Sequence, residues 1–199
     1  REYLDFLDGD LYKVHVPYSC TPDFIFGELK GRYDLVYVSA NGFILKRMVR
    51  IHRYPCFNGS RHFRDVVECF VHGWVDEIST VPPEHVVRCA LSNRFDRMIV
   101  HFIQPHAPYI GDVKLIMNEK QLTKYYRCGD LSLRLIREAY RCNLRRVLKS
   151  VGELVDKIGI RPVVVTSDHG ELLGEDNMVD HPCRYRHPAL NNVPFLIIR

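Results

Sequence analysis

RPVVVTSDHGELLGE, residues 161–175, is the most informative stretch of this chain. A continuous run of valines is typical of a buried parallel strand, and here the run ends at Thr166 and is followed by Asp168 and His169. Ligands of α/β folds bind just outside the carboxyl ends of such strands. A carboxylate beside an imidazole at that position indicates a site for a divalent metal ion. Gly170 comes next and, having no side chain, lets a ligand approach the backbone closely. The simpler alternative is a capping aspartate next to a surface histidine.

Strands and helices alternate along the rest of the chain. Apolar periodicity and turn residues predict helices at residues 23–30, 82–93 and 131–158, and strands at 34–40, 98–103, 162–168 and 193–198. Residues 43–60 are basic, aromatic and irregular, which favours a surface excursion. The alternation predicts an α/β fold, with one domain over residues 1–199 and a mainly parallel central sheet in a three-layer α/β/α arrangement.

Composition limits the classes of function. The chain has 199 residues and a net charge of +4, a mild bias toward anionic ligands and well below the charge typical of nucleic-acid-binding proteins. No apolar run approaches the roughly 18 residues of a membrane-spanning helix, so no membrane partner is expected. The seven cysteines are irregularly spaced, which favours reduced thiols over a disulfide framework or a zinc ribbon, and hence a cytoplasmic protein. The oligomeric state stays open.

The long helix expected at residues 131–158 carries two stripes of side chains. Apolar residues recur every three or four positions and predict the face that packs on the core. A basic stripe lies on a neighbouring face and consists of Arg134, Arg137, Arg141 and Arg145. We interpret it as a solvated face, with contact to a polyanion as the alternative.

A histidine lies in a short segment that is rich in proline. Residues 101–109, HFIQPHAPY, run from an apolar strand into a loop with two prolines. Because proline restricts the backbone, His106 has little freedom to move. A histidine held in this way can donate a proton or bind an anionic oxygen near neutral pH. An ordinary surface histidine is the alternative, and His101, inside the strand, is interpreted as a core or supporting histidine.

Two further clusters carry reactive side chains. Residues 18–22, YSCTP, place a serine, a cysteine and a threonine immediately before a helix. A helix N-terminus would lower the pKa of a thiol or hold a phosphate or sulfate oxygen, and ordinary helix capping is the alternative. Residues 180–183, DHPC, with His187 nearby, could fold back onto the same metal as Asp168, with Cys183 as a further ligand.

Taken in order, these segments resemble the sulfatase and alkaline phosphatase superfamily, and within it the compact sulfatase-like proteins of archaea. The resemblance extends over nearly the whole chain. The segments that carry it are Ser19–Pro22 as the nucleophile turn, Tyr37–Asn41 as the strand after the first helix, His101–Tyr109 as a His-Pro-rich element, Tyr140–Leu144 as the start of the long helix, Thr166–Glu175 as the metal motif, and His181-Pro182 and Val193-Pro194 as closing elements. The resemblance implies an alkaline phosphatase-like fold. It also implies a metal-dependent hydrolase or transferase that acts on small phosphate or sulfate esters through a covalent nucleophile.

The resemblance also assigns roles to individual residues. The implied metal ligands are Asp168 and His169, and His181 is implied as a further metal or substrate ligand. An imidazole ligand favours zinc or manganese, with magnesium or calcium as alternatives. The resemblance favours Cys20 as the nucleophile, with Thr21 and Ser19 as alternatives. His106 would contact the transferred phosphoryl or sulfuryl group.

Two positions depart from the family pattern. Phe24 stands where sulfatases carry the arginine needed to convert the cysteine to formylglycine. The metal-binding aspartate that normally follows the first strand is not seen. Arg1 resembles the end of an Asp-Ser-Leu-Arg motif, which would place that aspartate upstream of a chain truncated at both ends. Asp5, Asp8 and Asp10 are the substitutes within the chain. The alternative function is therefore a member that has lost catalysis and acts as a binding or scaffold protein. A nucleotide-binding domain is disfavoured because the chain has no glycine-rich phosphate loop.

Overall fold

The structure is a computed structural model and describes residues 2–199. Arg1, which the motif comparison singles out, lies outside the described residues. Contacts within the chain divide it into two compact units, where the sequence pattern predicts one domain. The first unit comprises the residues up to Gly27 together with 104–148 and 161–199, and the second comprises 28–103 and 149–160. Every residue expected to act as nucleophile, metal ligand or substrate contact falls in the first unit.

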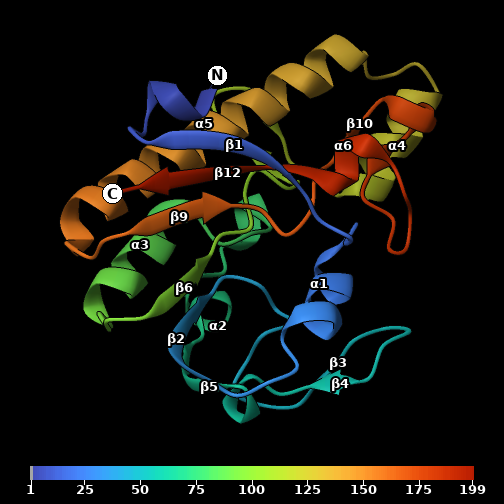
Figure 1. The fold of residues 1–199 in the computed structure, drawn as a ribbon. Helices are drawn as coiled ribbons and strands as arrows, with labels where there is room; N and C mark the ends of the chain where they lie inside the picture. The colour runs from blue at the N-terminus through green and yellow to red at the C-terminus, as the bar shows by residue number, and fades with distance from the viewer. Residues whose placement is uncertain (1) are drawn as a thin grey trace. The chain divides into compact units, whose positions relative to one another are not determined.

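The sheet of the first unit is antiparallel. It has the order β1-β12-β9, formed by Asp10–His15, Asn192–Ile198 and Val163–Thr166 (Figure 1). In the register of the second pair, Phe195 lies opposite Thr166 and Ile198 lies opposite Val163. Strand β9 therefore ends opposite Phe195 of β12. Asp168 and His169 follow shortly after the end of this strand.

The sheet of the second unit is parallel. It has the order β5-β2-β6, formed by Phe63–Val67, Tyr33–Ser39 and Met98–His101. Helices α2 (Cys69–Gly73) and α3 (Pro83–Ser92) contribute to one core with β2. The expected strand at 34–40 and the expected helix at 82–93 are confirmed within two residues.

The predicted fold class is wrong. The described residues form two separate three-stranded sheets and several two-stranded ribbons, not one mainly parallel sheet in a three-layer alkaline phosphatase-like arrangement. The error begins at β9, whose valines suggest a parallel strand buried on both faces. In the structure β9 pairs antiparallel with β12, and its exposure alternates, with Val164 47% exposed. An apolar run specifies a strand but does not specify the direction of its neighbour.

Short elements complete both units. In the first they are η1 (Glu2–Asp5), α1 (Thr21–Glu28, which runs into the second unit), β7 (Tyr109–Ile110), β8 (Lys114–Leu115), α4 (Glu119–Arg127), β10 (Leu172–Leu173), η4 (Glu175–Asn177), β11 (Val179–Asp180) and α6 (Pro188–Asn191). In the second they are β3 (Val49–Arg50), β4 (Cys56–Phe57), η2 (Gly59–Arg61) and η3 (Asp76–Ile78). The region expected to be irregular, 43–60, thus contains a small β3-β4 ribbon.

Helix α5 (Leu133–Ile158) is the long helix that the periodicity predicts. In the first unit Ile136 and Ala139 are buried in a core with Leu122 of α4. The arginine stripe is exposed, as expected of a solvated face. Two of its members pair with the carboxylate of Glu2: Arg141 lies 3.5 Å and Arg145 lies 3.2 Å from it. Across residues 2–199 we find no helix with the length and apolar character needed to span a bilayer.

Candidate functional site

The turn before α1 brings a threonine to the end of β9. Cys20 caps the helix, since its carbonyl accepts a hydrogen bond from the amide of Phe24 (3.2 Å). Thr21 is the first helical residue and is 9% exposed. Its Oγ1 lies 3.5 Å from Nε2 of His169, a residue 148 positions away in the sequence. The turn predicted to carry the nucleophile therefore meets the motif predicted to carry the metal ligands.

Asp168 and His169 form a compact pair of donors. Nδ1 of His169 lies 2.8 Å from the carbonyl oxygen of Gly170, so Nδ1 carries the proton and Nε2 is the acceptor for the Thr21 hydroxyl. Oδ1 of Asp168 accepts a hydrogen bond from the His169 amide (3.1 Å) and lies 3.7 Å from Nε2. Burial lowers the pKa of His169 despite the nearby carboxylate, which keeps the ring neutral. A neutral imidazole with an oriented Nε2 is the form that binds metals.

Gly170 serves a different purpose from the one its sequence context suggests. Its amide donates to the carbonyl of Leu190 (2.7 Å), and a Cβ added to it would lie 1.9 Å from the carbonyl oxygen of Ala189. The close neighbour is thus the chain around α6 and not a ligand. The glycine allows this segment to pack directly behind the Asp168–His169 pair.

His106 is held as a charged imidazolium. Its Nε2 lies 2.5 Å from Oε1 of Glu119, the first residue of α4, and its Nδ1 donates to the carbonyl of Ala107. Burial opposes the charge, but the hydrogen bond to Glu119 outweighs burial and raises the pKa of His106 to about 9. Burial would likewise raise the pKa of Glu119, yet the hydrogen bond with His106 lowers it to about 2.

A buried asparagine of α5 forms hydrogen bonds with the loop that carries His106. Nδ2 of Asn143 donates to the carbonyls of Pro105 (3.0 Å) and His106 (3.1 Å), and its Oδ1 accepts from the amide of Ile110 (3.0 Å). Asn143 is fully buried. The rigidity that the prolines predict is therefore reinforced by a side chain from a distant helix.

His181 lies between the two other histidines. Its ring stacks on His169 with centroids 4.5 Å apart, and it meets the ring of His106 edge-on at 4.8 Å. Its Nδ1 donates to Oε1 of Glu171 at 3.1 Å. Burial disfavours the charged ring, but the Glu171 carboxylate outweighs burial and raises the pKa of His181.

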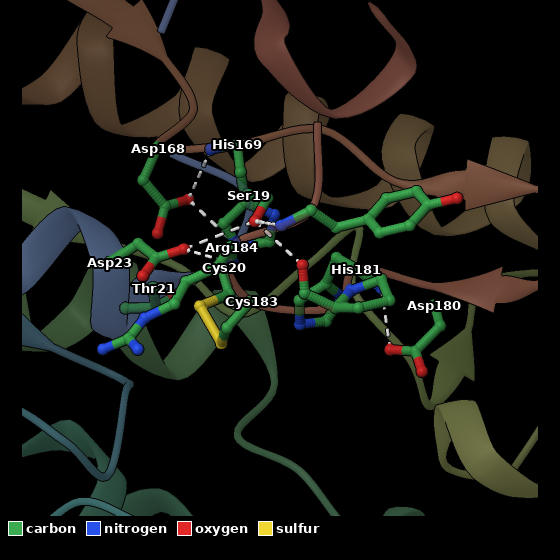
Figure 2. Close-up of a disulfide and its surroundings, with 12 residues drawn as sticks. Ser19, Cys20, Thr21, Asp23, Asp168, His169, Asp180, His181, Cys183 and Arg184 are labelled. Carbon is green, nitrogen blue, oxygen red and sulfur yellow. Dashed lines mark hydrogen bonds and ion pairs between the residues drawn. A yellow bond between two sulfur atoms is a disulfide. The ribbon is translucent and has the colours of Figure 1, made fainter. Parts of the chain in front are cut away.

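A disulfide joins the turn at residues 18–22 to the loop of His181. Cys20 and Cys183 are bonded, with their Cα atoms 5.0 Å apart (Figure 2). The prediction of reduced thiols is wrong for this pair, while the five other cysteines are free. Since 163 positions separate the partners, their spacing carries no local signal. In this state Cys20 has no thiol to act as a nucleophile, and Cys183 has none to bind a metal.

The predicted site residues thus come together, but in a different grouping from the one expected. Ligand atoms of His106, Glu119 and His181 lie within 4.8 Å of one another and could hold a metal ion. His181 therefore shares donors with His106, whereas the motif resemblance groups it with Asp168 and His169. The remaining pair, Asp168 and His169, lies beside Thr21 (Figure 2).

Other residues that the sequence singles out have structural roles. His101, in β6 of the second unit, lies 2.9 Å from the Tyr37 hydroxyl through its Nδ1, as expected of a supporting histidine. His187 caps α6 by accepting a hydrogen bond from the amide of Ala189. Two of the substitute aspartates form ion pairs at the protein surface, Asp5 with Arg145 and Asp10 with Arg199.

Sequence reasoning missed Glu119 and Asp23 as members of the site. Glu119 follows Asn118, which forms a capping box with Gln121 and so marks the start of α4. That signal predicts a helix terminus but not its contact with His106. In the sequence, Asp23 is only an acidic residue in the first turn of a predicted helix. Its contact with the His181 loop depends on tertiary structure.

No protein-family model matches this chain, and a search of curated proteins finds no relative of it.

Proposed function

We propose that this chain carries a metal-dependent centre for the hydrolysis or transfer of phosphate or sulfate esters. The observation that carries the proposal is the 3.5 Å approach of Thr21 Oγ1 to His169 Nε2. It joins a hydroxyl at a helix N-terminus to a carboxylate–imidazole pair, and two further histidines line the same place. The motif resemblance to sulfatases and alkaline phosphatases supports the same chemistry.

The Asp168–His169 pair fits a divalent cation. Its donor atoms, Nε2 of His169 and Oδ1 of Asp168, are 3.7 Å apart. Two ligand atoms that each lie about 2.0–2.2 Å from one ion can be separated by this distance. A zinc or manganese ion held there would polarise the ester and lower the pKa of a neighbouring hydroxyl.

Thr21 is the nucleophile that the geometry favours among the three residues of the turn. The sulfur of Cys20 is in the disulfide. The hydroxyl of Ser19 donates to the carbonyl of Pro182 (2.8 Å) and accepts from the amide of Tyr185 (3.1 Å). Only Thr21 directs its oxygen toward His169. Its Oγ1 would lose its proton to solvent and form the new bond to phosphorus or sulfur while the bond to the leaving oxygen breaks.

His106 would give its proton to the leaving oxygen or contact an equatorial oxygen. It is the imidazolium of the site, and it neighbours His181. A positioned acid of this kind contributes typically 10²–10⁴-fold to a rate. Water would then hydrolyse the threonine ester in a hydrolase, or an acceptor hydroxyl would take the group in a transferase.

The test is a comparison of metal content and turnover in matched variants. We expect p-nitrophenyl phosphate or p-nitrophenyl sulfate to be hydrolysed in the presence of zinc or manganese. Asp168→Asn is expected to lose the metal and reduce turnover about 100-fold or more, and Thr21→Val to lose turnover but keep the metal. Thr21→Ser should restore part of the activity. Asp156→Asn, on the exposed face of α5, is the matched carboxylate control. Equal metal content in Asp168→Asn and the unmodified protein would remove the assignment.

A binding protein without catalysis is the second candidate, and one observation favours it. Both ring nitrogens of His106 are engaged, with Glu119 and the Ala107 carbonyl, and His181 is paired with Glu171. The negative charge of these carboxylates would repel an anionic substrate. Metal binding and calorimetric binding of inorganic phosphate or sulfate without turnover would favour this function.

A further inference from the structure

The disulfide and a neighbouring carboxylate form a second group of potential ligands. The sulfurs of Cys20 and Cys183 and a carboxylate oxygen of Asp23 lie within 4.8 Å of one another. Cys20 directly precedes α1 and Asp23 lies in the first turn of that helix, so both belong to the start of α1. Figure 2 shows Asp23, Cys20 and Cys183 gathered around the sulfur–sulfur bond.

We propose that reduction of the Cys20–Cys183 disulfide opens a zinc site formed by the two thiolates and the Asp23 carboxylate. Thiolates are soft ligands that select zinc over magnesium or calcium, and a carboxylate completes a three-ligand set with an open fourth position. This site is separate from the Asp168–His169 pair and does not depend on the proposed ester chemistry.

The exposure of Cys20 and Cys183 indicates which of the two sulfurs a reductant attacks. Cys183 is exposed, whereas Cys20 is only 2% exposed. The thiolate of a dithiol reductant attacks the Cys183 sulfur, and Cys20 leaves as a thiolate that the N-terminus of α1 stabilises. The second thiol of the reductant then releases Cys183. The protein disulfide gains two electrons and two protons, and the dithiol becomes a cyclic disulfide.

The ligands stay close to one another after the covalent bond is broken. The same two segments are joined by three hydrogen bonds: Ser19 Oγ to the Pro182 carbonyl (2.8 Å), the Tyr185 amide to Ser19 Oγ (3.1 Å), and the Arg184 amide to Asp23 Oδ2 (2.8 Å). Two sulfurs at about 2.3 Å from one zinc ion lie roughly 4 Å apart. Side-chain rotation after reduction is therefore sufficient to admit the ion, which displaces the two thiol protons.

The experiment measures zinc bound per chain in the oxidised and the reduced protein. Each form is loaded with zinc alone, freed of excess metal and reductant under anaerobic conditions, and analysed by mass spectrometry of the metal. We expect the reduced protein to hold one more equivalent than the oxidised protein. Cobalt(II) in place of zinc should give thiolate charge-transfer absorption in the reduced form that is absent from the oxidised form.

Variants separate this site from other donors. Cys183→Ser should abolish the extra equivalent. Asp23→Asn keeps the disulfide during folding and should weaken zinc binding to the reduced form at least about tenfold. Cys56→Ser, an exposed free cysteine, is the matched control and should leave the increment unchanged. The proposal is overturned if reduction adds no zinc, or if the increment persists in Cys183→Ser. These readouts are the zinc content and the cobalt absorption, so they do not depend on whether the protein hydrolyses esters.

Discussion

At the scale of the residue, the ion pair of His106 with Glu119 makes stability depend on pH. The pKa of His106 rises from 6.5 to about 9 in the folded protein, so its contribution is complete below pH 6.5 and is lost as pH rises toward 9. The pKa of Glu119 falls from 4.5 to about 2, so its contribution is complete above pH 4.5 and is lost as pH falls toward 2. The two shifts describe one interaction, which is strongest between about pH 4.5 and 6.5.

Glu119→Gln is expected to lower the midpoint of thermal unfolding most within that window. The difference from the unmodified protein should shrink as pH rises through about 9 and as pH falls through about 2, because beyond these values one partner of the pair is uncharged in both states. The measurement is thermal unfolding by circular dichroism in the presence of a chelator, since a metal at His106 would displace the proton. A difference of the same size at every pH would contradict the assignment of the charged pair.

At the scale of the element, Asn143 couples helix α5 to the loop that carries His106. Asn143→Ala would leave buried carbonyls and the Ile110 amide without their partner, and an unsatisfied buried group costs about 1–3 kcal/mol. We expect the free energy of unfolding in urea to fall by about 3 kcal/mol. Asn93→Ala removes an exposed amide that bonds the Cys89 carbonyl in α3 and should cost less than about 1 kcal/mol. Equal losses in the two variants would show that the loop does not depend on Asn143.

Elements whose signal is local were predictable. The stripe of α5, the proline at the start of α3 and the short helix after Thr21 were all found within two or three residues of the expected bounds. Strand β9 was also found, but its antiparallel pairing was not, because pairing with β12 joins segments about 30 residues apart and leaves no local pattern. Strand β1 was missed because Asp10–His15 has only short apolar stretches and none of its residues is buried.

At the scale of the whole molecule, the disulfide closes most of the chain into one loop. Cys20 and Cys183 are separated by 163 positions, and a cross-link that closes a long loop restricts the unfolded chain most. Reduction of the protein in a metal-free buffer is expected to lower the free energy of unfolding by about 2–5 kcal/mol. Denaturant titrations with and without a phosphine reductant measure this. Cys183→Ser should match the reduced protein and no longer respond to the reductant, whereas a response equal to that of the unmodified protein would mean that another group is reduced.

Some features of the candidate site have a local signal in the sequence, and others depend on contacts between distant segments. The Thr-Ser-Asp-His-Gly-Glu motif, the turn at residues 18–22 and the proline-bounded His106 could be singled out as candidates because each is a short run of reactive residues. Their meeting in one unit, the pairing of His106 with Glu119 and the bond between Cys20 and Cys183 could not be recognised. Helical periodicity and turn chemistry act over a few positions, so they can be read along the chain. Strand direction, cross-links and ion pairs depend on which distant segments bury surface against each other, and that is settled only when the chain folds.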